Sequence, residues 1–265
     1  VIGVFGQQRG DEGKGRVVDM LAESCDIVAR FNGGSNAGHT VVLPDGRELA
    51  LHIVPSGIAH QKAVNVIGNG TIVDPVRFAD ELRDIEKLGI QVTPKNLKVS
   101  ASAHLVLPHY KQLEEIRGLG RGAQGSTKAG IADTYAAKAQ RAGVRAERLL
   151  GSHESLLQVV REGLESVGTA RKEHGLPSVD IENEVKLYAL ALKKLQPFVT
   201  DTSLYVNERL VGGATLLAEG AQAFLLDIDH GMYPYVTSSS TTACGVAPGL
   251  GIAPTTLERS IGIVK

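Results

Sequence analysis

The stretch Val1-Ile2-Gly3-Val4-Phe5, followed by Gly6-Gln7-Gln8-Arg9-Gly10, opens the chain and decides its fold class. Its first five residues form a short apolar run of the kind that fills a buried strand. The glycines that follow predict a turn, and Val17, Val18 and Leu21 then recur at helical spacing. A strand, a glycine-rich turn and a helix are the first half of a βα unit, which indicates a parallel sheet.

Further strand and helix patterns alternate along the chain. Apolar runs predict strands over 26–31, 63–68 and 215–219, and a strand pair or one bent strand over 97–107. Asp74 before Pro75 predicts the start of a helix, which Gly89 ends. We therefore predict an α/β fold with a mainly parallel central sheet flanked by helices, in a single nucleotide-binding domain over residues 1–265.

A mostly helical subregion is expected around residues 154–198. Leu156, Val160 and Leu164 mark one amphipathic helix, Tyr188 and Leu192 mark a second, and residues 172–177 separate them. We expect this helix pair to pack against the sheet. Glycine-rich loops are predicted over 33–39, 117–125 and 231–251.

The composition excludes several classes of function. The 265 residues carry a formal net charge of −1 and no Lys/Arg-rich run, so no nucleic-acid partner is expected. No apolar stretch approaches the ~20 residues of a membrane span, so no membrane partner is expected either. Cys25 and Cys244 lie far apart and do not suggest a disulfide framework. We expect a cytoplasmic protein with reduced cysteines.

The run Gly10-Asp11-Glu12-Gly13-Lys14-Gly15 is the first candidate functional segment. A glycine-rich turn before a helix exposes backbone N–H groups to a phosphate, and the lysine adds a full positive charge. The two carboxylates can hold Mg²⁺ or take a proton. The run departs from the P-loop pattern, because Gln8 and Gly15 stand where that pattern has glycine and Ser/Thr. Taken alone, it also fits a tight turn with solvated charges or a generic P-loop phosphohydrolase.

Several separated polar motifs along the chain, taken together and in order, form a recognisable set. They are the run from Gly10 to Arg16, the loop Gly33-Gly-Ser-Asn-Ala-Gly-His-Thr40, and the segments 55–58, 67–70, 219–222, 226–231 and 233–238. In this order they resemble the GDEGKGK, GGxNAGHT, PSGI, IGNG, EGAQ, LDIDHG and YPYVTS segments of the adenylosuccinate synthetase family. The resemblance covers the whole chain.

This resemblance implies a ligase that forms a C–N bond in purine nucleotide (AMP) biosynthesis. The family joins L-aspartate to the 6-position of IMP through a 6-phosphoryl intermediate, driven by GTP and dependent on Mg²⁺. Asp11 matches the base that removes the N1 proton and contacts the metal, and Gly38 matches a carbonyl ligand of the metal. His39 matches the acid that steadies the γ-phosphoryl group. Gln222 matches the residue that supports the purine 6-oxygen, and Lys14 stabilises phosphoryl charge.

The resemblance also implies nucleotide contacts and an oligomeric state. Asn36, Thr127 and Thr237 match positions that bind the 5′-phosphate of the nucleotide. Arg141 fits an arginine that reaches across a dimer interface, so a homodimer is expected, although a solvated helix charge explains the same residue. The remaining implied contacts to nucleotide are Gly10, Glu12, Gly13, Gly15 and Thr40.

The sequence also departs from the family pattern. Ala132-Asp133 stands where Gly-Pro is expected, and Ala223 replaces a glycine. These changes keep open a phage branch of the family that ligates aspartate to (d)GMP. ATP stays open as the donor because the sequence lacks the family's guanine-reading segment. The aspartate-binding loop and the guanine-reading segment of the family do not occur in the sequence. We expect a longer protein that lacks its C-terminal part here; the alternative is a nucleotide-binding fragment without catalysis.

Overall fold

The computed structural model describes residues 1–43, 45–60, 62–119 and 127–265. Its centre is a seven-stranded sheet in the order β11-β1-β10-β2-β5-β7-β9 in which every neighbouring pair is parallel. The strands are β1 (Ile2–Gly6), β2 (Ile27–Arg30), β5 (Val64–Ile67), β7 (Leu97–Ser100), β9 (Val199–Thr200), β10 (Leu216–Glu219) and β11 (Arg259–Ile263). The predicted α/β fold with a mainly parallel sheet is confirmed.

Two small sheets accompany the central one. Strands β3 (His39–Val42) and β4 (Glu48–Leu51) form an antiparallel hairpin, and β6 (Ile72–Val73) pairs in parallel with β8 (His104–Leu105). The segment 97–107 therefore holds two strands, as one of the predicted alternatives stated, but they belong to different sheets. The predicted loop over 33–39 is correct up to residue 38, because His39 already begins a strand.

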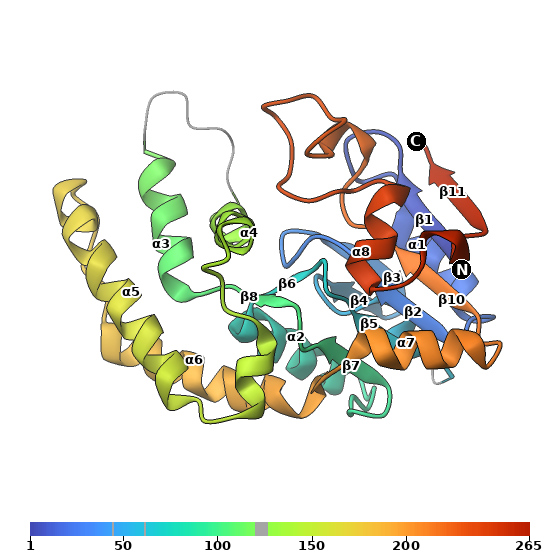
Figure 1. Ribbon diagram of the computed structural model, residues 1–265, viewed down its shortest axis with the longest axis horizontal. Helices are drawn as coiled ribbons and strands as arrows, with labels where there is room; N and C mark the ends of the chain where they lie inside the picture. The colour runs from blue at the N-terminus through green and yellow to red at the C-terminus, as the bar shows by residue number, and fades with distance from the viewer. Residues whose placement is uncertain (44, 61, 120–126) are drawn as a thin grey trace.

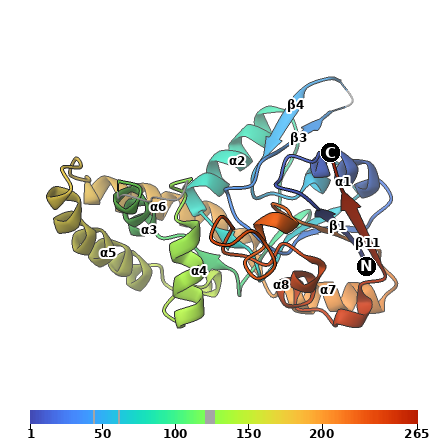
Figure 2. The ribbon, with the colours of Figure 1, turned by 90° about the horizontal axis from the view of Figure 1, so that it is seen from above.

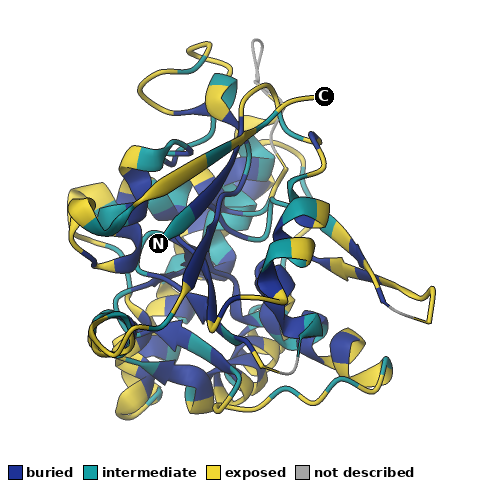
Figure 3. Ribbon diagram, turned by 90° about the vertical axis from the view of Figure 1, so that its right-hand side faces the viewer, coloured by how far each residue is buried: buried dark blue, intermediate teal, exposed yellow. Residues whose placement is uncertain are grey.

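Helices cover both faces of the central sheet. α1 (Lys14–Ala22) packs on one face, where Val28 meets Val4 and Val18. α7 (Thr202–Val211) and α8 (Val246–Leu250) pack on the other, where Ile27 and Ala29 lie. Successive residues of β2 thus face opposite layers, as a strand buried on both sides requires. The dark blue strands within the teal and yellow helices show this layering in Figure 3.

The N-terminal cap of α2 (Pro75–Lys87) is the one that the sequence predicts. The Asp74 side chain accepts hydrogen bonds from the backbone N–H groups of Val76 and Arg77, and Gly89 follows the helix at φ +83°. Helices α3 (Pro108–Arg117), α4 (Ile131–Gln140) and α7 were not predicted, and the segment 231–251 contains the short helix α8 among its loops. The predicted loop over 117–125 lies for the most part outside the described residues.

The helical subregion contains α5 (Glu154–Glu173) and α6 (Ile181–Leu195), as predicted. The break between them spans residues 174–180 rather than 172–177, because α5 continues to Glu173. α5 packs on α3 and α6, and α6 packs on α2, so helices rather than the sheet are the main partners of this pair. Figures 1 and 2 show α3, α5 and α6 together on the side away from β1 and β11. The expectation that the pair packs against the sheet was wrong for α5.

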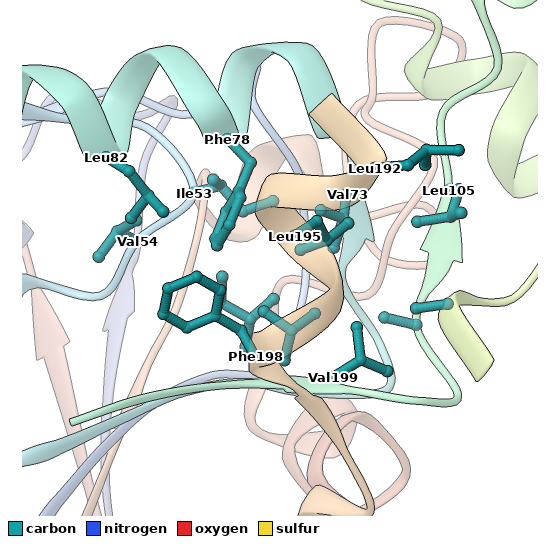
Figure 4. Close-up of a cluster of buried hydrophobic side chains, with 14 of the residues drawn as sticks. Ile53, Val54, Val73, Phe78, Leu82, Leu105, Leu192, Leu195, Phe198 and Val199 are labelled. Atoms are coloured by element: carbon teal, nitrogen blue, oxygen red, sulfur yellow. The ribbon is translucent and has the colours of Figure 1, made fainter. Parts of the chain in front are cut away.

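The largest hydrophobic cluster joins this helical part to the rest of the molecule. Phe78 on α2 lies edge-on to Phe198, with ring centroids 5.6 Å apart, and Leu192 and Leu195 of α6 fill the space beside them. Figure 4 shows Phe78 and Phe198 beside each other with Leu195 next to them, and Leu192 further along α6 near Leu105. Leu97 and Val99 of β7 belong to the same cluster. Among the described residues, no helix is both long and apolar enough to span a membrane.

Candidate active site

A cavity of about 580 Å³ lies at the carboxyl ends of β1, β10 and β2. These three strands are adjacent and parallel, so the loops that follow them meet at one edge of the sheet. The lining residues are Arg9, Gly10, Asp11, Gly13, Lys14, Gly15, Arg16, Arg30, Asn36, Ala37, Gly38, His39, Thr40, Ala50, Leu51, His52, Glu219, Gly220, Ala221, Gln222 and Leu226. The structure thus brings together most of the site residues that the sequence predicts.

The Glu12 carboxylate is turned into the loop rather than into the cavity. It accepts hydrogen bonds from the backbone N–H groups of Gln8 at 3.1 Å and Gly10 at 2.9 Å, and Lys14 Nζ lies 2.6 Å from its other oxygen. Burial alone would raise the pKa of Glu12, but Lys14 and the Gly10 N–H outweigh it and lower the pKa. Glu12 therefore shapes the loop and orients the ammonium group, and its predicted contact to nucleotide stays a prediction.

The close fit of this ion pair explains the glycine at the end of β1. A Cβ atom on Gly6 would lie 2.5 Å from Glu12 Oε2 and 2.8 Å from Lys14 Nζ. Only a residue without a side chain leaves room for the pair. The motif of residues 10–15 thus depends on a glycine four residues before it.

Asp11 adopts a left-handed backbone conformation with φ +55°. Such a conformation is uncommon for a residue with a side chain and is concentrated at functional sites. The Asp11 side chain is exposed and lines the cavity, and among the described residues its carboxylate accepts no hydrogen bond. A carboxylate held toward the cavity with free oxygens can take a proton or ligate a metal ion.

His39 packs directly on the first turn of α1. A Cβ atom on Gly15 would lie 2.8 Å from His39 Cβ and 3.3 Å from Cγ and Cδ2 of the ring. The Ser/Thr that a P-loop carries at this position would therefore collide with the histidine. The departure from the P-loop pattern has a structural cause: the imidazole occupies the space beside the helix N-terminus.

On its other side the imidazole faces a buried carboxylate. His39 Nε2 lies 3.2 Å from Glu219 Oε1, although the angle at Nε2 does not meet the geometry of a hydrogen bond. Burial lowers the pKa of His39, and the negative charge of Glu219 opposes that shift without cancelling it. The ring is therefore neutral at neutral pH before a ligand binds.

Gln222 and Asn36 meet across the cavity. Gln222 Nε2 donates to Asn36 Oδ1 at 3.3 Å, whereas Gln222 Oε1 is buried with no partner among the described residues. The backbone of Gln222 is also left-handed, with φ +58°. Gly33 makes this possible, because a Cβ atom there would lie 2.7 Å from Ala221 Cβ and 3.0 Å from Gln222 Oε1. A strained amide with a free buried oxygen is suited to a ligand.

Besides Glu12, three predicted nucleotide contacts lie outside this cavity. Thr127 and Arg141 are exposed on either side of α4, and Arg141 caps that helix at φ +62°. Thr237 is half-buried and donates its backbone N–H to Leu226 O at 2.8 Å. The segment of Thr127 begins at residues 125 and 126, which lie outside the described part of the chain. The structure does not bring these three residues to Asp11 and His39.

The sequence analysis missed two buried charges at the ends of central strands. Arg30 ends β2 and Glu219 ends β10, they are 1% and 2% exposed, and they face each other in register. A charged residue at the end of an otherwise apolar strand was the available signal. Among the described residues Arg30 Nη1 donates to His52 O at 3.0 Å, while Nε and Nη2 have no partner.

The donor set fits a magnesium ion that shares its ligands with a substrate. Among the described residues no three His, Cys, Asp or Glu side chains cluster as a metal site. Mg²⁺ commonly takes one or two protein ligands and completes its shell with waters and substrate phosphates. The free carboxylate of Asp11 and the exposed Gly38, which line the same cavity, meet that requirement.

Comparisons with known proteins agree with this site. A family model described as adenylosuccinate synthetase matches residues 3–265. The adenylosuccinate synthetase of Clostridium botulinum (strain 657 / Type Ba4) is 43% identical over 267 residues, which cover 99% of this chain and 61% of the relative. That of Pelodictyon phaeoclathratiforme is 44% identical over 265 residues, covering 99% of this chain and 60% of the relative.

Solved structures show the same fold. The fully ligated adenylosuccinate synthetase from Plasmodium falciparum matches with a TM-score of 0.85 and 35% identity, covering 100% of this chain and 61% of that one. The succinoaminodeoxyadenylate synthetase of cyanophage S-2L, bound to dGMP and dATP, matches with a TM-score of 0.66 and 23% identity over 99% of this chain and 63% of that one, which supports the fold alone. The chain spans about three fifths of the length of the curated relatives. It belongs to the adenylosuccinate synthetase family.

Proposed function

We propose that this chain carries the phosphoryl-transfer site of an adenylosuccinate synthetase, a ligase that joins L-aspartate to the 6-position of IMP at the expense of GTP. The observation that carries the proposal is the convergence of Asp11, Lys14, His39 and Gln222 on one cavity. A base, two groups that stabilise charge and an amide for the purine are what this chemistry needs. Relatives that bear this name match the chain over 99% of its residues.

The first step makes the 6-oxygen of IMP a nucleophile. Asp11 takes the proton from N1, the electron pair moves onto the 6-oxygen, and Gln222 holds that oxygen through its side-chain amide. The oxygen then attacks the γ-phosphorus of GTP and GDP leaves. In the second step the amine of aspartate attacks C6 and displaces phosphate, with loss of an amine proton, which gives adenylosuccinate.

Charge stabilisation dominates the first step, because phosphoryl transfer needs little covalent help from the protein. Lys14 is aimed by Glu12, and the N-terminus of α1 adds partial positive charge from its free N–H groups. His39 steadies the γ-phosphoryl group. Asp11 and Gly38 would hold Mg²⁺, which when bound supplies further positive charge to the phosphates.

The remaining contacts extend this proposal. Asn36, Thr127 and Thr237 bind the 5′-phosphate of IMP, and Thr40 assists with the triphosphate. Arg141 is exposed and outside the cavity of its own chain, which supports a role in the site of a second copy within a homodimer. The enzyme works in the cytoplasm, where purine nucleotides are made.

A substrate panel tests the proposal. Phosphate release is measured with IMP or dGMP crossed with GTP or ATP, each with Mg²⁺ and with or without aspartate, and nucleotide binding is followed by calorimetry. We expect release with IMP and GTP that depends on aspartate, and a loss of about 10²–10⁴-fold in kcat for Asp11→Asn. Asp84→Asn is the matched control, because its carboxylate is exposed on α2 and paired with Lys87.

The outcomes separate the possible functions. Nucleotide binding without any phosphate release would favour a binding fragment, and release without aspartate would favour a phosphohydrolase. Turnover with dGMP in place of IMP would assign the chain to the other substrate class. Asp11→Asn with the kcat of the parent protein would remove the base from the mechanism.

A further inference from the structure

Glu219 holds a buried carboxylate at the end of the central strand β10. Its Oε2 accepts a hydrogen bond from the Ser56 backbone N–H at 2.9 Å, and its Oε1 accepts one from Ser56 Oγ at 3.2 Å. The residue is 2% exposed. A buried carboxylate is costly unless it is hydrogen-bonded and close to positive charge or to further donors. Ser56 supplies two donors and fixes the orientation of the group.

The Glu219 carboxylate forms no ion pair with the neighbouring Arg30 in the described structure. Arg30 lies opposite Glu219 in register on β2, yet no oxygen of Glu219 is within 4.0 Å of a guanidinium nitrogen in the described structure. Arg30 Nη1 is instead directed to His52 O. Glu219 Oε1, which Ser56 Oγ also reaches, points toward His39, so an internal salt bridge does not explain why the carboxylate is there.

His39 presents one of its ring nitrogens to this carboxylate. Nε2 is buried, lies 3.2 Å from Glu219 Oε1, and has no hydrogen-bond partner among the described residues. Nδ1 makes no hydrogen bond to the described part of the chain either, and His39 lines the cavity. Gly15 packs against the ring and limits its rotation. Catalytic hydrogen bonds are often poorly aligned before the ligand binds, so the 3.2 Å approach is compatible with a hydrogen bond from Nε2–H to the carboxylate in the complex.

Resting on the proposed role of His39, we propose that Glu219, anchored by Ser56, is a positioning residue that accepts the Nε2 proton of His39 and so fixes the plane of the ring at the edge of the cavity. A carboxylate that fixes the tautomer and plane of a histidine is a recurring device in enzymes and metal sites. Here the three residues come from β10, from the segment after β4 and from β3. The arrangement fixes the tautomer and the orientation of the ring.

The tautomer of His39 is the first test, and it needs no turnover. Long-range proton–nitrogen NMR spectra of histidine-labelled protein at pH 8 assign both ring nitrogens, and His39→Asn identifies the signal. We expect the Nε2–H form in the parent protein and a mixture in Glu219→Gln, so that the separation between the two nitrogen shifts shrinks. Glu81→Gln is the matched control: Glu81 is also a buried carboxylate, but it accepts only backbone N–H groups, and this variant should leave the His39 spectrum unchanged.

Kinetics give the second test. Glu219→Gln should lower kcat about 10–100-fold, with KM for GTP changed by less than about threefold, and it should add no further loss to His39→Asn. An equal loss in both backgrounds, or an unchanged tautomer in Glu219→Gln, would overturn the proposal. If Glu219→Gln does not fold, Ser56→Ala, which removes one anchor, should shift the tautomer in the same direction.

The two proposals fail in different ways. Absence of aspartate-dependent phosphate release from the parent protein counts against the proposed function, while the tautomer still decides the role of Glu219. Normal turnover together with an unchanged tautomer in Glu219→Gln and Ser56→Ala counts against the positioning role alone.

Discussion

Replacing Gly15 by alanine tests whether helix propensity or packing against His39 has the larger effect on stability at this position. Gly15 is the second residue of α1, and alanine is favoured over glycine in helices by ~0.5–1 kcal/mol. The structure predicts the opposite sign. The new Cβ would lie 2.8 Å from His39 Cβ, and because carbon atoms prefer separations of ~3.5–4.0 Å, the histidine or the helix must move by about 0.7 Å.

The magnitude follows from these two terms. Overpacking of this kind costs ~1–3 kcal/mol and the helix gain offsets ~0.5–1 kcal/mol, so Gly15→Ala should lose ~0–2.5 kcal/mol of unfolding free energy. At this chain length 1 kcal/mol corresponds to ~2–4 °C in Tm. Because His39 is displaced, kcat should also fall, by up to ~100-fold if the misplacement approaches ~1 Å, and the affinity for GTP with Mg²⁺ should fall as well.

Gly168→Ala provides the matched control. Gly168 also lies inside a helix, α5, and a Cβ atom there would meet nothing within 4 Å. This variant should gain ~0.5–1 kcal/mol and keep its nucleotide affinity. Urea unfolding and calorimetry on the three proteins compare the effects directly. If Gly15→Ala is stabilised as much as Gly168→Ala and binds GTP normally, the contact between His39 and α1 is not what excludes a side chain at position 15.

Three further predictions concern the rest of the fold. Burial, helped by nearby cations, lowers the pKa of His104 from 6.5 to about 4. As the pH falls, the unfolded chain therefore binds the proton before the folded protein does. The contribution of His104 to folding stability is complete above pH 6.5 and is lost as the pH falls toward 4. In urea unfolding, the contribution of His104 to the free energy of unfolding should be about 2 kcal/mol smaller at pH 5 than at pH 7.5. His104→Gln should remove this decrease from the dependence of the unfolding free energy on pH. Asp74→Ala removes the cap of α2 and should cost ~1–2 kcal/mol by the same assay, with Asp74→Asn closer to the parent protein. Phe78→Ala should cost ~3–5 kcal/mol, whereas the exposed Leu187→Ala should change little; equal losses would contradict the packing of the largest cluster.

The parts of the fold that the sequence predicts are those with a local signal. The strand β1, the helix α2 with its cap at Asp74 and the stripes of α5 and α6 follow from apolar periodicity and capping residues. Helices α3 and α4 carry fewer such signals, although Pro108 at the first position of α3 was one that could have been used. α3 buries only Pro108 and Glu114 within its span and has no side-chain cap, and α4 begins at a glycine. Their helical state depends on packing against neighbouring elements, which a window of sequence does not contain.

The residues of the candidate site also fall into those with a local sequence signal and those without one. Asp11, His39 and Gln222 could be named because each sits in a motif that resembles a segment of the adenylosuccinate synthetase family. Arg30 and Glu219 could not be paired, because they are 189 residues apart and meet only through the order and register of the strands. Glu12 shows that a motif does not determine the direction in which a side chain points. Its motif predicts a ligand contact, but the space above Gly6 lets the carboxylate turn inward and bind the loop and Lys14 instead.

In the proposed function, the loop after β1 would bind phosphate through a different set of groups from those of a P-loop. In the P-loop pattern the residue after the lysine supplies a hydroxyl to the metal. Here that position is a glycine whose missing side chain admits the His39 ring, and the metal ligand is expected from Asp11, three residues before the lysine. A serine or threonine at position 15 would collide with His39, so its hydroxyl could ligate a metal only if the histidine moved away. The glycine, the histidine and the carboxylate of Glu219 behind it thus form one packed unit, and a change in any of them should alter the other two.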